Sequence, residues 1–196
     1  MFPRINVSMF LVLLIALTSL ALSNTPQDKM GMTGFRAEFI GQVQFVQGRI
    51  TQLEQAMPAD KFMWRPGEGV RSVGEVYMHI AFSNYMFIKI SGQKVPDDIK
   101  MDMDPMEWEK TVTGKDAIKK ILDRSFADLI AAAKNITEAD LEKTVHVFGM
   151  DMSLRSFMMT MLGHMHEHLG QSIAYARMNG VVPPWTAEQQ KAEAKQ

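Results

Sequence analysis

Four long segments of this chain repeat apolar side chains at intervals of three and four residues. Such spacing places the apolar groups on one face of an α-helix, and this pattern constrains the fold more than any other feature. The four segments cover residues 33–56, 72–90, 115–134 and 153–178. Stretches that contain proline or glycine separate them, so the helices can fold back on one another. The pattern therefore predicts an all-α fold, a four-helix bundle.

Local signals mark several of the helix ends. Thr33 is a candidate N-cap of the first helix, and Ser153 is a candidate N-cap of the fourth. Ser72 and Glu75 match the Ser-x-x-Glu capping box, in which each side chain binds a free backbone amide at the start of the second helix. Residues 94–113 are rich in acidic side chains and include two prolines, which predicts a long crossover loop between helices two and three.

The connections carry further predictions. Phe62 and Trp64 are expected to anchor the first connection to the bundle, and Trp108 is expected to be buried within the crossover. Residues 144–148 alternate apolar and polar side chains before Gly149, which indicates a short hairpin ahead of the fourth helix.

The two ends of the chain differ in composition from the bundle. Arg4, an apolar stretch and the small residues before Asn24 are typical of a secretory signal peptide, so we expect export to the periplasm or beyond. No stable membrane insertion is expected after processing; an uncleaved N-terminal anchor is the alternative. The expected organisation is a signal peptide at 1–23, a flexible lead-in at 24–32, the bundle at 33–185 and a polar tail at 186–196.

Charge and cysteine content exclude several function classes. The formal net charge is -1 and the isoelectric point is about 6.5, so the chain lacks the basic surplus that binding to nucleic acid requires. The chain has no cysteine, which excludes disulfides, thiolate nucleophiles and sulfur-rich metal sites. Any metal ion must therefore be held by imidazole or oxygen ligands.

The histidines supply the strongest chemical pattern. His164 and His168 are four residues apart in a predicted helix, so they share a face and can bind one ion. His166 points to nearly the opposite side. His79 lies in the second helix and is the candidate third ligand, although a lone histidine in an apolar helix is also typical of a hydrogen-bonded core residue. His146 lies outside the four helices and is expected at the surface.

Three imidazoles suit zinc, and a site with three protein ligands leaves a fourth position for water or substrate. We expect a divalent cofactor, zinc or nickel, while iron, cobalt and manganese fit the same donors. Such an ion can activate water or a small nucleophile toward a small-molecule substrate.

Supporting roles follow from spacing. Glu75 precedes the second-helix histidine by four residues and Gln171 follows the last histidine by three, so either can reach the second ring nitrogen of a ligand. Helix capping by Glu75 and packing between helices by Gln171 are the alternatives. Glu167 is a weak candidate for a general base, and a solvated glutamate on a helix face fits the same position. Asn84 and Tyr85 are candidates to line the pocket.

Several of these segments together resemble the DinB-like family of metal-binding bundles. The resemblance rests on Trp64-Arg65-Pro66, Arg71-Ser72-Val73-Gly74-Glu75 with His79-Ile80-Ala81, His164 to Gln171, and Tyr175 to Pro184. It covers the chain from about Thr33 to Trp185. It implies a left-handed, up-up-down-down bundle with one long crossover, often dimeric, in which His79, His164 and His168 hold a divalent ion.

The resemblance leaves the reaction open. Some members of the family resemble thiol-dependent transferases that use low-molecular-weight thiols, and others are taken as metal hydrolases. An exported protein meets few reducing thiols, which disfavours the first class here. We therefore expect a metal-dependent hydrolase or group transferase. The resemblance also implies that two copies of the chain can form a homodimer. The alternative is a noncatalytic module that binds a metal or ligand in a structural or vestigial site.

Overall fold

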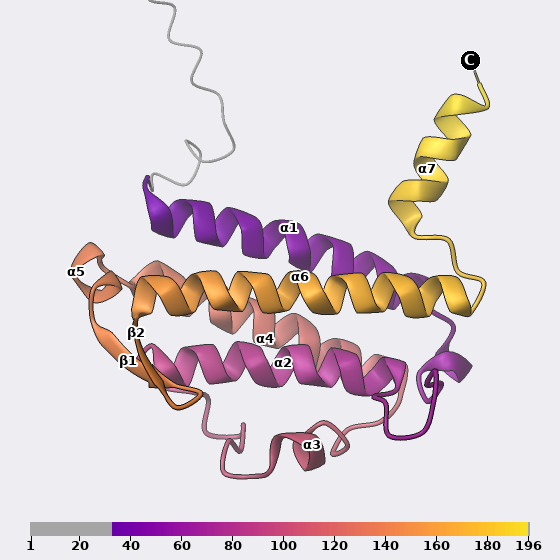
Figure 1. Ribbon diagram of the computed structural model, residues 1–196. Coiled ribbons are helices and arrows are strands. Elements are labelled where there is room, and N and C mark those ends of the chain that lie inside the picture. The colour runs from indigo at the N-terminus through magenta and orange to yellow at the C-terminus, as the bar shows by residue number, and fades with distance from the viewer. Residues whose placement is uncertain (1–32, 196) are drawn as a thin grey trace, which may run out of the picture.

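The computed structural model describes residues 33–195 and is built around four long helices (Figure 1). These are α1 (Phe35–Ala56), α2 (Val73–Ile90), α4 (Lys115–Asn135) and α6 (Leu154–Met178). The predicted all-α four-helix bundle is confirmed. The signal peptide and lead-in predicted before Thr33 lie outside the described residues.

Short elements fill the connections between the long helices. They are the 3-10 helix η2 (Ala59–Lys61), α3 (Pro105–Trp108), α5 (Glu138–Leu141), β1 (Thr144–Val147), β2 (Met150–Ser153) and, after the bundle, α7 (Pro184–Glu193). Strands β1 and β2 pair antiparallel, so the predicted hairpin is confirmed. Its turn places Phe148 and Gly149 at positive φ, as a two-residue hairpin turn requires.

Side-chain contacts at the helix ends fix the direction of α4. Lys115, at the start of α4, donates hydrogen bonds to the carbonyls of Gln55 and Met57 at the end of α1. Gln93, just after α2, donates to the carbonyl of Ala132 near the end of α4. Helix α4 is therefore antiparallel to α1 and parallel to α2.

Helix α6 runs parallel to α1, because Arg155 at its start stacks on Phe35 at the start of α1. The order of directions is thus up-down-down-up, which corrects the up-up-down-down order implied by the resemblance. The physical reason is the number of crossovers: only the connection between α2 and α4 crosses from one end of the bundle to the other, and an up-up-down-down order needs two such crossovers.

Two of the three predicted N-caps are confirmed. Ser72 accepts a hydrogen bond from the Glu75 amide while the Glu75 carboxylate accepts one from the Ser72 amide, which completes the capping box. Ser153 caps α6 with its side chain. The prediction for Thr33 is wrong, because α1 begins one residue later, after Gly34, whose φ of 78° takes the turn into the helix without a side-chain cap.

The connection between α1 and α2 is pinned to the bundle as predicted. Phe62 is buried and its carbonyl accepts a 2.8 Å hydrogen bond from the Gly74 amide. A side chain at Gly74 would place its Cβ 2.8 Å from the end of the Ile118 side chain of α4 and 3.2 Å from the Phe62 carbonyl, so glycine suits the close approach of the connection, α2 and α4. Trp64 packs edge-on against Tyr175 of α6, with 5.4 Å between ring centroids. The residues just before α2 are thereby held in place.

The crossover is held on the other side of α2. Asp104 caps the short helix α3, and Trp108 at the end of α3 is buried against Phe82 of α2, with 5.5 Å between ring centroids. The burial predicted for Trp108 is confirmed. Because this anchor directly precedes Glu109, that side chain is placed against the middle of α2.

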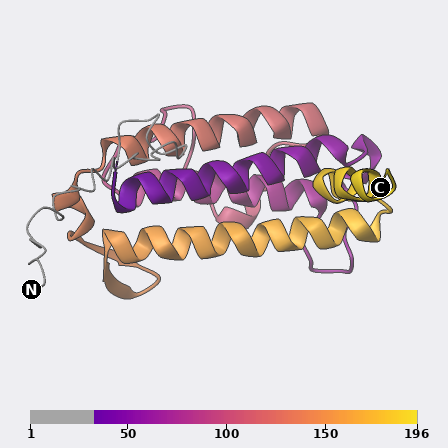
Figure 2. The same cartoon turned by 90° about the horizontal axis from the view of Figure 1, so that it is seen from above.

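Helix α7 projects from one end of the bundle, as Figures 1 and 2 show. Its exposed polar residues fit the composition of the predicted tail, although the sequence pattern indicated no helix there. Trp185 of α7 contacts the bundle, with the centre of its ring 4.4 Å from the Arg49 guanidinium of α1. Within residues 33–195, no helix is both long and apolar enough to cross a membrane.

One carboxylate lies fully inside the bundle without a partner. Glu54 of α1 is completely buried, and neither of its carboxylate oxygens accepts a hydrogen bond within the described residues. The neighbouring Lys115 and Lys119 of α4 are engaged elsewhere, with α1 carbonyls and with Asp123. Burial raises the pKa of Glu54 above its usual 4.5, more than the nearby lysines lower it.

We expect the Glu54→Gln variant to be more stable than the wild type near pH 7, by about 1 to 3 kcal/mol, because it removes a buried unpaired charge. Since the folded pKa of Glu54 is raised, the wild type loses stability as the pH rises through that value, and the gap between the two proteins closes below about pH 4.5. Urea unfolding of both proteins across this pH range measures the effect. Equal stability near pH 7 would contradict it.

Candidate metal centre

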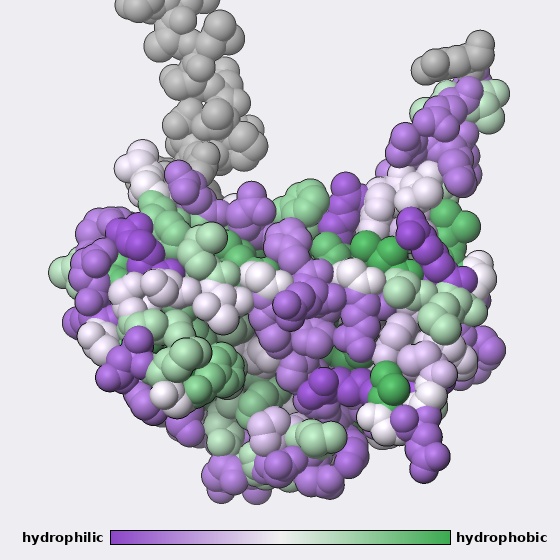
Figure 3. Space-filling model, in the orientation of Figure 1, coloured by the Kyte–Doolittle hydropathy of each residue, from purple (hydrophilic) through white to green (hydrophobic). Residues whose placement is uncertain are grey.

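Three histidines from two helices meet on the face of the bundle where α2 and α6 lie side by side. His79 comes from α2, and His164 and His168 come from α6. The Nε2 atom of His164 lies 3.0 Å from Nε2 of His79 and 3.1 Å from Nε2 of His168. One ring nitrogen from each lies within 4.8 Å of the others, and all three side chains are partly exposed. Figure 3 shows hydrophilic residues gathered over the middle of this face.

Helix packing turns the α6 histidines toward α2. Met161, Met165 and Leu169 are buried on the core side of α6, and His164 and His168 occupy the adjoining edge of the same helix. A four-residue spacing stacks these two imidazoles one turn apart, as the sequence predicted.

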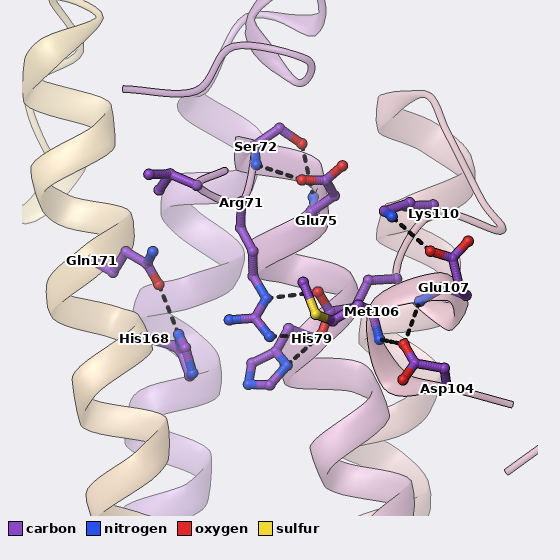
Figure 4. Close-up of polar contacts among 12 residues, drawn as sticks. Arg71, Ser72, Glu75, His79, Asp104, Met106, Glu107, Lys110, His168 and Gln171 are labelled. Carbon is purple, nitrogen blue, oxygen red and sulfur yellow. Dashed lines mark hydrogen bonds and ion pairs between the residues drawn. The ribbon is translucent and has the colours of Figure 1, made fainter. Parts of the chain in front are cut away.

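The second ring nitrogen of His79 binds a carboxylate. Nδ1 of His79 lies 2.6 Å from Oε1 of Glu109, whose side chain is only 2% exposed. Arg71 donates to both oxygens of the same carboxylate, from Nε at 2.6 Å and from Nη2 at 3.0 Å (Figure 4). Burial by itself would raise the pKa of Glu109, but the hydrogen bonds and charges of His79 and Arg71 outweigh burial and lower it.

An ionised carboxylate only accepts hydrogen bonds, so Nδ1 of His79 must carry the proton that it shares with Glu109. In the neutral imidazole, Nε2 of His79 then carries a lone pair, and this lone pair faces the other two histidines. Glu109 therefore sets the tautomer of His79.

A chain of hydrogen bonds sets the tautomer of His168 in the same way. The carbonyl of Arg71 can only accept, so the Tyr175 hydroxyl donates to it, over 3.2 Å. That hydroxyl then accepts from Nε2 of Gln171 at 3.0 Å, which turns the amide oxygen of Gln171 toward Nδ1 of His168 at 2.8 Å (Figure 4). Nδ1 of His168 is therefore the donor, and its Nε2 also presents a lone pair.

His164 is neutral between these two rings. Burial, followed by the charges of His168 and His79, lowers the pKa of His164 to about 3. Burial is also the largest cause that lowers the pKa of His168. A neutral His164 has one ring proton, so it can satisfy at most one of the two lone pairs that face it.

This donor set fits a divalent metal ion. At least one of the two lone pairs that face His164 has no donor from the three rings, and a cation held between the three nitrogens would satisfy both. In a tetrahedral zinc site with Zn–N bonds of about 2.0–2.1 Å, two ligand nitrogens are roughly 3.3 Å apart. The observed separations of 3.0 and 3.1 Å are close to that value.

The structure separates the supporting residues that the sequence suggested. Gln171 binds the second nitrogen of His168, as predicted. Glu75 does not bind His79: its carboxylate caps α2 and pairs with Arg65 at 3.0 Å, so the capping alternative holds. The carboxylate that binds the second nitrogen of His79 belongs to Glu109. Sequence reasoning missed it because it lies 30 residues further along the chain, in the crossover. The predicted burial of Trp108 was the only nearby signal.

None of the remaining candidates makes a hydrogen bond to the three rings within the described residues. His166 and Glu167 are exposed on α6, with Glu167 directly before His168, and His146 is exposed in β1, where it pairs with Asp151. Asn84 is buried and donates to Ser125 of α4, on the far side of α2 from α6. Tyr85 is likewise buried toward α4 and does not line the site.

Comparison with known proteins identifies the family. The profile of the DinB superfamily matches residues 42–172, which is most of the bundle and includes all three histidines. The chain belongs to the DinB superfamily. A search of curated proteins finds no match.

Solved structures share the DinB fold at low sequence identity. A DinB-like protein from Bacillus cereus has 19% identity over 74% of this chain and 93% of its own, with a TM-score of 0.62. YfiT from Bacillus subtilis, described as a probable metal-dependent hydrolase with an unusual four-helix bundle topology, has 15% identity over 74% and 88%, with a TM-score of 0.60. A mycothiol-dependent maleylpyruvate isomerase has 13% identity over 70% and 62%, with a TM-score of 0.58.

The contact between Glu109 and His79 predicts a specific effect on metal affinity in this DinB protein. In Glu109→Gln, the partner of His79 and Arg71 loses its charge, so we expect metal affinity to fall about 10- to 100-fold. Competition with a chromophoric chelator measures it. Glu75→Gln is the matched control, because it makes the same change near His79 but keeps the capping box, and its affinity should equal that of the wild type. Equal affinity in both variants would contradict the role of Glu109.

Proposed function

We propose that His79, His164 and His168 bind one divalent ion, zinc or nickel, through their Nε2 atoms, and that the protein is a metal-dependent hydrolase or group transferase of a small molecule. One observation carries the proposal. Glu109 and Gln171 bind the Nδ1 atoms of His79 and His168, so the Nε2 lone pairs of these two histidines both point at the ring of His164. The description of YfiT as a probable metal-dependent hydrolase supports the same class of function.

The chain supplies three neutral nitrogen donors from two helices, which leaves coordination positions for a substrate. A bound divalent ion supplies Lewis-acid chemistry: it polarises a substrate oxygen and lowers the pKa of water. Glu109 positions His79 and is not free to accept a proton from substrate, since both its oxygens already accept hydrogen bonds. Glu167, the nearest exposed carboxylate in sequence to His168, remains our candidate for a general base.

The reaction class follows from the proposed location. We propose export through the signal peptide at residues 1–23, on the strength of its composition. Outside the cytoplasm, low-molecular-weight thiols are scarce, so hydrolysis is favoured over the thiol chemistry named for the mycothiol-dependent relative. We also propose that the protein forms a homodimer and that it has no nucleic-acid partner.

Elemental analysis of untagged protein tests the site. We expect about one ion per chain in the wild type and less than a tenth of that in His79→Ala and His164→Ala, because two imidazoles bind far more weakly than three. His166→Ala is the matched control, since it removes an exposed histidine from the same helix, and it should keep the full metal content. Equal metal in all four proteins would contradict the site.

Turnover separates the enzyme from the noncatalytic alternative. On metal-loaded protein, we expect an ester, amide or thiol-transfer panel to give an activity that is lost after chelation and in His79→Ala, and retained in His166→Ala. A metal content of one ion per chain without turnover on any substrate of the panel would instead assign a structural or vestigial site.

A further inference from the structure

The guanidinium of Arg71 uses only one of its edges. Nε and Nη2 hold the Glu109 carboxylate in a side-on pair. Nη1 makes no hydrogen bond within the described residues, and the side chain is 32% exposed. The outer edge, made of Nη1 and the second hydrogen of Nη2, therefore offers two parallel N–H donors to a ligand.

This free edge lies beside the three histidines. Glu109 Oε1 is shared between Arg71 and His79, which places the guanidinium next to the His79 ring. The backbone of Arg71 is held from the other helix, because its carbonyl accepts from Tyr175 of α6. Figure 4 shows the guanidinium between α2 and α6, with Nη1, the nitrogen that makes no hydrogen bond among residues 33–195, on the side of His168. The site and the free edge thus face the same space.

The charges around the site favour an anion. Glu109 balances Arg71, and Glu75 is paired with Arg65. The exposed Glu167 beside His168 adds one negative charge, fewer than the two positive charges of the ion. Three neutral imidazoles leave both charges of a divalent ion uncompensated. An anionic group that reaches this half-buried space therefore gains from the ion and from the N–H donors of Arg71 together.

The shape of the donor set favours a carboxylate over a phosphate. The free edge of one guanidinium can pair with two oxygens of a carboxylate or of a phosphate. A carboxylate is then fully paired, whereas the remaining oxygens of a phosphate need further donors. The backbone amides at the start of α2 are occupied, those of Ser72 and Glu75 by the capping box and the two between them by carbonyls of the preceding connection. Lys110 is paired with Glu107.

We propose that Arg71 is a specificity-determining residue that binds the carboxylate of a small-molecule substrate on its outer edge, while another part of the substrate reaches the metal. The inference deepens the proposed function and rests on it, since the second point of attachment is the ion held by the three histidines. The substrate class is small carboxylic acids and their derivatives that keep one free carboxylate.

Cobalt-loaded protein provides the test. With Co²⁺ at saturation, the visible absorption of the ion is titrated with acetate, malonate and succinate, with the neutral acetamide and with inorganic phosphate. We expect at least one of the carboxylates to bind the wild type about tenfold or more tighter than Arg71→Met and Arg71→Lys, because lysine keeps the charge toward Glu109 but has no second edge. Arg65→Met is the matched control for the loss of one positive charge, and its affinities should equal those of the wild type.

The outcomes separate the two proposals. If the wild type gives no histidine-dependent cobalt spectrum, the metal site itself fails. If cobalt binds but the carboxylates have the same affinity for wild type, Arg71→Met and Arg71→Lys, the role of Arg71 is overturned and the site stands. An equal loss in Arg65→Met, or tighter binding of phosphate than of every carboxylate, also overturns the proposal.

Discussion

The carboxylate of Glu109 is the contact on which the site depends. It binds His79 on α2 and Arg71 in the connection before α2, and it reaches them from the crossover on the other side of that helix. Three segments far apart in the sequence are therefore tied together at one buried group. Because the group is ionised and only accepts, it also decides which nitrogen of His79 is free. The packing of Trp108 against Phe82 holds Glu109 in this position.

Arg71 links this contact to the other half of the site. Its side chain binds Glu109, and its carbonyl begins the chain through Tyr175 and Gln171 that ends at His168. The two outer ligands are thus oriented by one connected network before any ion binds. Such preorganisation lowers the cost of forming the site, since the rings need not reorient. Trp64 supports the same network, because it packs edge-on against Tyr175.

The sequence predicted what depends on local spacing. Helical periodicity, the Ser72 and Glu75 capping box and the four-residue step between His164 and His168 each act within a few residues, so the pattern alone was sufficient. The position of Glu109 depends on the path of the crossover, which no periodicity encodes. The same holds for the relative directions of the helices, which follow from which connection crosses the bundle. Thr33 was a plausible cap by residue type, but the positive φ of Gly34 starts the helix later.

The account rests on three ring nitrogens around one ion, and X-ray absorption at the metal edge of zinc-loaded protein tests this most directly. The account predicts three imidazole nitrogens at about 2.0–2.1 Å, with the multiple scattering typical of histidine, and loss of this three-imidazole signal in His79→Ala, which binds the ion far more weakly. An absorption spectrum dominated by oxygen ligands, or one unchanged by the His79→Ala substitution, would contradict it.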